Sequence, residues 1–149
     1  MDKTALTRRR RERAVCVLYE PFMPRLSSRK ATIARNRIEY FHSVGCRISD
    51  HALDPIVYAE STEEEATAIL RKALAGQKLT AEEVAKFKTQ VLVFLGREYA
   101  KKGWVMQLHL SSIRNNSTRM FKLLGPDTGY DAMGDFVYAE ALIAFLDKL

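Results

Sequence analysis

The chain is organised around Gly103-Trp104-Val105-Met106-Gln107-Leu108-His109-Leu110, which is followed by Ser111-Ser112-Ile113-Arg114-Asn115-Asn116. Residues 105–110 are an apolar run of strand length, and they predict a short buried strand. Directly beyond this strand the sequence becomes polar. Because ligands of parallel α/β sheets bind at the carboxyl ends of the strands, His109 and Arg114 have the layout of a functional site.

The two side chains suit two kinds of chemistry. His109 could bind a metal or transfer a proton, and Arg114 could hold a carboxylate through two parallel hydrogen bonds. The alternative is that His109 is a capped histidine at a strand end and that Arg114 is a surface cation. On these two residues alone, this alternative is the simpler interpretation.

Two helices precede the strand. Thr80-Ala81-Glu82-Glu83 is a capping box, and the helix that it starts runs to about Lys101. An earlier helix opens at Thr62-Glu63-Glu64-Glu65, with acids in its first turn, and stops at Gly76. Together they predict a helical hairpin over residues 62–102, inserted between two strands.

A similar unit lies nearer the N-terminus. Ser27 or Ser28 offers an N-cap for a helix that runs to about Ser43 and is closed by Gly45. The short strand Cys46-Arg47-Ile48-Ser49-Asp50-His51 follows it. Two units of helix, glycine, strand and polar strand end predict α/β repeats around a shared sheet. Asp50 and His51 are adjacent, so on a strand they point to opposite faces. The alternative is a turn in which these side chains bond to the backbone.

The remainder of the chain predicts two helices and a loop. Residues 118–124 form a short helix, and residues 138–149 form a final one. Between them, residues 125–135 hold three glycines, a proline and three aspartates, which predicts a long loop. Such a loop is either functional or a solvated connector.

The positive charge is concentrated at one end. Residues 1–37 contain 11 Lys and Arg against three acids, a net +8, so residues 38–149 carry −2 of the overall +6. Arg8-Arg9-Arg10-Arg11 could contact a phosphate backbone. The alternative function is therefore a small basic module that binds nucleic acid or another polyanion. No aromatic residue interleaves with these arginines to stack on bases, which favours a solvated charge run and makes nucleic acid an unexpected partner.

The sequence argues against several other classes. No apolar run reaches the ~18 residues of a membrane span, and the N-terminus lacks the pattern of a secretory signal. Cys16 and Cys46 form neither a disulfide framework nor a Cys-x-x-Cys pair, so we expect a cytoplasmic protein without a zinc ribbon.

Four separated motifs, in the same order, resemble uronate (glucuronate) isomerase of the amidohydrolase superfamily. They are residues 45–54, 93–100, 103–107 and 114–127. The resemblance runs from about residue 31 to residue 149 and implies an α/β fold. We expect a mostly helical segment of a (β/α)₈ barrel with about two barrel strands. Residues 1–30 are a basic segment with no resemblance to the family.

The resemblance also implies an activity and site residues. The family interconverts D-glucuronate with D-fructuronate, and D-galacturonate with D-tagaturonate, at a site with a divalent metal, usually zinc. It implies a metal-side and catalytic role for His109, a catalytic role for His51, and binding of the hexuronate by Arg114, Asn115 and Asn116. Asp131 and Asp135 lie in a family loop near the site and are assigned no role.

Parts of the family pattern have no counterpart in this chain. A complete barrel takes roughly 250 residues, and the chain has 149. The family's His-x-His metal motif and its last-strand aspartate are missing, and one histidine cannot hold a catalytic zinc. We therefore expect the chain to be inactive by itself and to bind no metal alone. Two strands with open edges also predict self-association.

Overall fold

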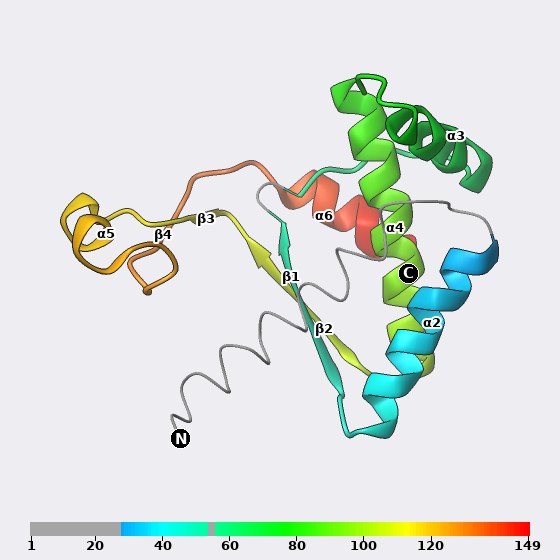
Figure 1. The fold of residues 1–149 in the computed structure, drawn as a ribbon, viewed down its shortest axis with the longest axis horizontal. Helices are drawn as coiled ribbons and strands as arrows, with labels where there is room; N and C mark the ends of the chain where they lie inside the picture. The colour runs from blue at the N-terminus through cyan, green and yellow to red at the C-terminus, as the bar shows by residue number, and fades with distance from the viewer. Residues whose placement is uncertain (1–27, 54–55) are drawn as a thin grey trace.

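The computed structural model describes residues 28–53 and 56–149 (Figure 1). Arg8 to Arg11, Cys16 and most of the basic segment 1–30 lie outside the described residues. In chain order the elements are α2 (Ser28–Ser43), β1 (Ile48–Leu53), α3 (Glu63–Leu74), α4 (Ala81–Lys101), β2 (Val105–Leu110), β3 (Ser112–Ile113), α5 (Thr118–Leu124), β4 (Ala132–Met133) and α6 (Ala139–Leu146).

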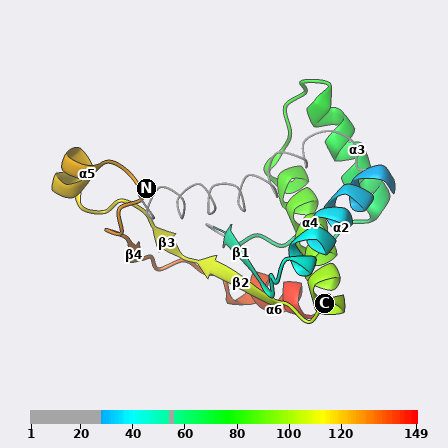
Figure 2. The ribbon, with the colours of Figure 1, turned by 60° about the horizontal axis from the view of Figure 1, so that its bottom comes forward.

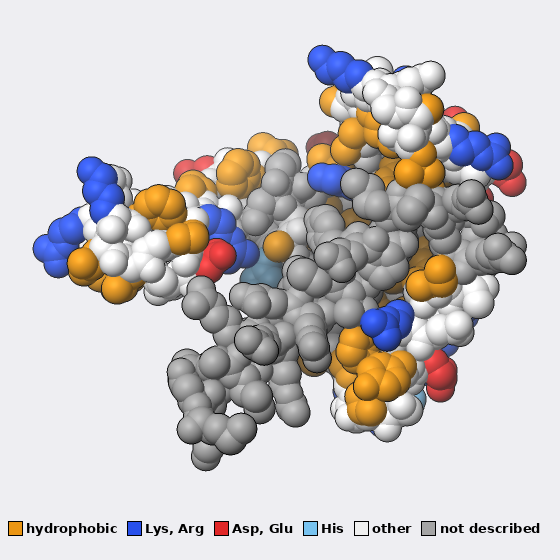
Figure 3. Space-filling view, viewed as in Figure 1, with side chains coloured by type: hydrophobic (Ala, Val, Ile, Leu, Met, Phe, Trp, Pro, Cys, Tyr) orange, Lys and Arg blue, Asp and Glu red, His pale blue; other side chains and the backbone are white. Residues whose placement is uncertain are grey.

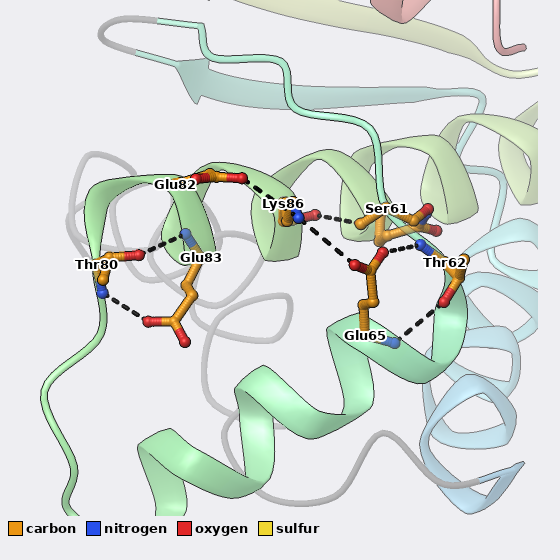
Figure 4. A network of polar contacts seen from close by, with 8 residues as sticks. Ser61, Thr62, Glu65, Thr80, Glu82, Glu83 and Lys86 are labelled. Carbon is orange, nitrogen blue, oxygen red and sulfur yellow. Dashed lines mark hydrogen bonds and ion pairs between the residues drawn. The ribbon is translucent and has the colours of Figure 1, made fainter.

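Helices α3 and α4 begin at two capping boxes, which Figure 4 shows side by side. Thr62 Oγ1 accepts from the Glu65 backbone N–H at 3.2 Å, and Glu65 Oε2 accepts from the Thr62 N–H at 2.8 Å. Thr80 and Glu83 repeat this exchange at 3.1 and 2.7 Å. Lys86 Nζ lies 3.5 Å from Glu65 Oε1 and so links α4 to the start of α3. The capping box predicted at Thr80 is confirmed.

Strands β1 and β2 pair in parallel, in a register that runs from Ile48 opposite Val105 to Leu53 opposite Leu110. The predicted sharing of one sheet by two α/β units is therefore confirmed. Both strands point the same way, so their carboxyl ends lie at the same edge. Helices α3 and α4 provide the connection that a parallel pair requires.

One face of this sheet is covered by helices. Apolar side chains from β1 and β2 pack against α4 and α6, and Phe145 of α6 is 2% exposed. A second cluster joins α2 to α4 through Ile38, Leu95 and Tyr99. Figures 1 and 2 show α4 lying beside α2 and α6. The core therefore lies between the sheet and these helices.

The other face, which we call the open face, is exposed. The prediction that residues 105–110 form a buried strand is wrong for this face, because Val105 is 62% exposed and Ile48 is 51% exposed. Side chains alternate along a strand, so only every second residue reaches the helical layer. The open face consists of Ile48, Asp50, Ala52, Val105, Gln107 and His109.

Residues 111–137, which we call the arm, extend away from the remaining described residues, which we call the body (Figure 1). Within the arm, β3 and β4 pair antiparallel, with Ser112 opposite Met133 and Ile113 opposite Ala132. The prediction that residues 125–135 are entirely loop is wrong, because a two-residue strand is too short to show a period of its own. Apolar side chains gather on the arm surface (Figure 3), and Leu123 is 70% exposed.

The last residues return to α4. Helix α6 ends at Leu146, before the predicted end at Leu149. Leu149 packs against Gly96, where a Cβ atom would lie 2.6 Å from Leu149 Cδ2. The Lys148 carbonyl accepts from Arg97 Nη2 at 2.6 Å. A glycine in mid-helix thus gives this side chain room to approach α4 closely.

Candidate functional site

His109 lies on the open face near the carboxyl end of β2. Its Nε2 atom is 2.6 Å from Asp50 Oδ1 of the neighbouring strand. The register places Asp50 opposite Gln107, so His109 is the diagonal neighbour of Asp50 on the same face. The two side chains are 40% and 61% exposed, which leaves the pair accessible to a ligand.

The Asp50 contact determines which ring nitrogen of His109 carries the proton. An ionised carboxylate only accepts hydrogen bonds, so the proton of the neutral ring belongs on Nε2, and Nδ1 is the acceptor or ligand atom. The amide nitrogen of Gln107 lies 3.2 Å from the same Nε2 atom. With Nε2 protonated, this amide bonds better when its oxygen faces the ring.

His51 lies on the opposite, covered face of the sheet. Its ring packs on Tyr99 of α4, with ring centroids 5.7 Å apart. Burial lowers the pKa of His51 from its ordinary value of 6.5, against a smaller opposing effect of the Asp50 carboxylate. The structure therefore brings Asp50, and not His51, together with His109. This follows from the expected alternation of Asp50 and His51 between faces.

Three polar atoms on this covered side have no hydrogen-bond partner among the described residues. They are the hydroxyls of Ser49 and Tyr99 and the Nε2 atom of His51. Burial raises the pKa of Tyr99 to about 12, so its hydroxyl keeps its proton at neutral pH. His51 is likewise neutral there, which makes this a neutral polar group behind the sheet.

Arg114, Asn115 and Asn116 lie in the arm, directly after β3. Arg114 Nη1 donates to Asp131 Oδ2 at 3.0 Å, and the Asn115 backbone N–H donates to Asp131 Oδ1 at 2.9 Å. The Asn116 N–H donates to the Tyr130 carbonyl at 2.7 Å. The three predicted binding residues are thus held by the segment just before β4.

Sequence reasoning missed the contact of Asp50 with His109 and that of Asp131 with Arg114. The contact of Asp50 with His109 can be inferred from the alternation of side chains only when the register of β1 against β2 is known. The contact of Asp131 with Arg114 can be inferred only when β3 is known to pair with β4. Neither pairing has a local signal in the sequence, because each joins residues that are distant along the chain.

A complete metal site is not present in the described part of the chain. Within residues 28–53 and 56–149, no group of three or more His, Cys, Asp or Glu side chains could hold a metal ion. Asp50 and His109 are two such side chains in mutual contact, whereas a catalytic zinc usually has three protein ligands. The same residues contain no helix long and apolar enough to cross a membrane.

Comparisons with known proteins identify relatives across most of the chain. The family model described as glucuronate isomerase matches residues 29–149. A uronate isomerase of Caldicellulosiruptor saccharolyticus is 54% identical over 131 residues, which is 88% of this chain and 26% of the relative. A uronate isomerase of Oceanobacillus iheyensis is 50% identical over 115 residues, which is 77% of this chain and 24% of the relative.

Solved structures match in the same way. The crystal structure of a uronate isomerase from Thermotoga maritima superposes with a TM-score of 0.67 at 35% identity and covers 80% of this chain and 27% of that one. The crystal structure of a glucuronate isomerase from Caulobacter crescentus superposes with a TM-score of 0.62 at 29% identity and covers 80% of this chain and 25% of that one. The chain thus spans about a quarter of the length of the curated relatives that it matches.

Proposed function

We propose, from the premise that this chain belongs to the glucuronate isomerase family, that it supplies part of the active site of a uronate isomerase. The substrates would be hexuronates, in the interconversions of D-glucuronate with D-fructuronate and of D-galacturonate with D-tagaturonate. Residues 31–149 would form one unit, a segment of a (β/α)₈ barrel that includes β1 and β2, with residues 62–102 as its helical hairpin. The parallel β1–β2 pair backed by helices supports this.

The pairing of His109 with Asp50 on the open face is the single observation that carries the proposal. Isomerisation between an aldose and a ketose moves a proton from C2 to C1, and a histidine is suited to accept and return it near neutral pH. Asp50 would hold the ring and keep the proton on Nε2, which leaves Nδ1 to act on the substrate.

Arg114, Asn115 and Asn116 would bind the hexuronate. A guanidinium matches a carboxylate through two parallel hydrogen bonds, and the two asparagine side chains offer amide donors and acceptors for sugar hydroxyls. For His51 the geometry supports a packing role against Tyr99.

The family's divalent metal does not fit the described residues of this chain alone, since they contain no group of three ligating side chains. Nδ1 of His109 has one lone pair, so in a complete barrel His109 would serve either as this base or as one ligand of the metal, with the further ligands coming from elsewhere. The isolated chain would then lack both the metal and the isomerase activity.

A chimera tests this proposal. Residues 29–149 replace the matching segment of the C. saccharolyticus uronate isomerase, and conversion of D-glucuronate to D-fructuronate is measured. We expect an active chimera, and loss of at least about a hundredfold in rate when His109→Ala or Asp50→Ala is introduced. Val105→Ala, on the same face but at the opposite end of β2, is the matched control. A folded chimera that keeps full activity with His109→Ala would refute the role of this pair.

The isolated 149-residue chain provides the second arm of the test. We expect no isomerisation by this chain alone. A measurable rate that is lost on His109→Ala would show that the chain is self-sufficient.

The alternative of a basic polyanion-binding module depends on Arg8 to Arg11, which lie outside the described residues, and no described contact favours it. Binding to random duplex DNA that weakens steeply with salt, and that neutralisation of these arginines abolishes, would support it.

A further inference from the structure

We propose that Asp131 is a positioning residue, which fixes the guanidinium of Arg114 in the orientation that meets the carboxylate of a hexuronate. The inference rests on the proposed function, because that function supplies the anion that Arg114 binds. Asp131 would act on the substrate only through Arg114 and the adjoining backbone.

One carboxylate bridges two consecutive residues. Asp131 Oδ2 accepts from Arg114 Nη1 at 3.0 Å, and Asp131 Oδ1 accepts from the Asn115 backbone N–H at 2.9 Å. The first bond fixes the end of a long side chain, and the second fixes the backbone from which the next side chain projects. Asp131 therefore positions both the guanidinium of Arg114 and the backbone of Asn115.

The strand pairing aligns these groups. Ser112 lies opposite Met133 and Ile113 lies opposite Ala132. One step further along the same antiparallel register brings Arg114 opposite Asp131. Cross-strand neighbours of opposite charge are a favourable pair. The pairing of β3 with β4 therefore places the Asp131 carboxylate beside the Arg114 guanidinium.

The backbone at Asn115 is held in an uncommon conformation. Asn115 has φ = 57°, a left-handed conformation that asparagine tolerates better than most residues. The Asp131 carboxylate supports its N–H, and the Asp127 N–H donates to its side-chain oxygen at 3.0 Å. This turn is thus braced from two points of the segment 125–135, as a preorganised binding turn would be.

The side chain of Asp131 is ionised at neutral pH. The hydrogen bond from the Asn115 N–H, together with Arg114, holds the pKa of the Asp131 carboxyl below its ordinary value of 3.8. Asp131 is therefore an anion at neutral pH, as a sugar carboxylate is. Holding the guanidinium beforehand removes part of the rotamer entropy that an arginine loses on binding.

The first measurement concerns Arg114 in the 149-residue chain without any sugar. The order of the Arg114 Nε–H group is followed by ¹⁵N relaxation in the unchanged chain, in Asp131→Asn and in Asp135→Asn. An asparagine at 131 has one acceptor oxygen, so one of the two bonds must be lost. Asp135→Asn removes the same charge from a side chain for which the described residues show no hydrogen bond or ion pair. We expect the order of Arg114 to fall in Asp131→Asn only.

The second measurement is binding of D-glucuronate by NMR titration, with D-glucose as the uncharged probe. We expect Asp131→Asn to weaken D-glucuronate binding by about three- to tenfold, with no change for D-glucose and none in Asp135→Asn. Unchanged amide shifts in α4 establish that the body remains folded in each variant.

The outcomes separate the two proposals. Tighter D-glucuronate binding by Asp131→Asn would mean that Asp131 competes for Arg114, and it would overturn the inference. So would equal weakening in both variants, or an unchanged order of Arg114. If the unchanged chain does not distinguish D-glucuronate from D-glucose, Arg114 does not bind the sugar carboxylate in the isolated chain. The chimera then decides the proposed function, and the order of Arg114 decides whether Asp131 positions it.

Discussion

The body and the arm of this chain are ordered by different interactions. All the buried apolar side chains of the described residues lie in the body, including Tyr99 at 1% and Phe145 at 2% exposure. In the arm, all of which the structure describes, Ser111 is the one buried residue, and Met133 is 93% exposed. The arm is held instead by hydrogen bonds around Asp131. A local shape can thus be well defined by polar contacts without a core beneath it.

This comparison separates stability from site geometry. The body gains free energy from apolar burial, about 25 cal/mol per Å² removed from water. The arm buries little in this chain, so its contacts contribute mainly by choosing one conformation for Arg114 and its neighbours. Changes to buried side chains of the body should therefore alter unfolding, and changes around Arg114 in the arm should alter binding.

The largest expected difference is in amide hydrogen exchange. We expect residues 84–99 of α4 to exchange only through global unfolding, and the arm to exchange through local opening that costs much less. Residues 105–109 of β2 should fall between them, because one face of that strand is open. Equal, strong protection in α4 and β2 of a monomer would contradict this and would show a self-sufficient domain.

The next largest effect concerns one pair of phenylalanines. Phe145→Ala should lower the free energy of unfolding by about 3–5 kcal/mol, since it removes a buried ring and leaves a cavity. Phe121→Ala makes the same change in the arm, where the ring is 44% exposed, and should cost less than about 1 kcal/mol. Urea unfolding followed by circular dichroism measures both. Similar losses would mean that the arm shares the core of the body.

Helix caps offer a smaller contrast. Thr80→Ala removes the hydroxyl that accepts from the Glu83 N–H and should lower the free energy of unfolding by about 1 kcal/mol. Ser117→Ala removes the matching bond to the Met120 N–H at the start of α5. It should fray α5 without shifting the unfolding midpoint of the body. A midpoint shift as large as that of Thr80→Ala would contradict the separation of the two regions.

The smallest effect is a pH dependence confined to the body. Because the pKa of His51 is lower in the folded chain than its ordinary 6.5, the unfolded chain binds more protons below that pH. His51 therefore contributes stability that is present above about pH 6.5 and is lost as the pH falls through its folded pKa. His51→Phe keeps a ring against Tyr99 and should flatten the decline between pH 7 and pH 5. Parallel curves for the two proteins would contradict this.

Local signals in the sequence predicted the helices well. Thr80 with Glu83, and Gly76 after α3, are boundary signals within a few residues of what they control. The strand β2 was also predicted with its observed bounds, since it is an apolar run of strand length that follows a helix and a glycine. These features depend on capping and periodicity, which act over one or two turns.

The details of the site could not be predicted from such signals. The contact between His109 and Asp50 depends on the register of two strands separated by two helices, and a shift of one residue would present His51 instead. The burial of Val105 depends on what covers its face, which its own neighbours do not specify. Arg114 was identified as a candidate, but its anchor Asp131 lies across a ladder of only two residue pairs.

The alternation along β1 and β2 has a consequence for protein engineering. Each strand presents one set of side chains to the helices and another to the open face, and the two sets are interleaved residue by residue. A combinatorial library restricted to the open face would explore new surface chemistry while every position that contacts α4 and α6 keeps its residue. The same six-residue strands can therefore serve as a fixed scaffold and as a variable surface, with few trade-offs between the two.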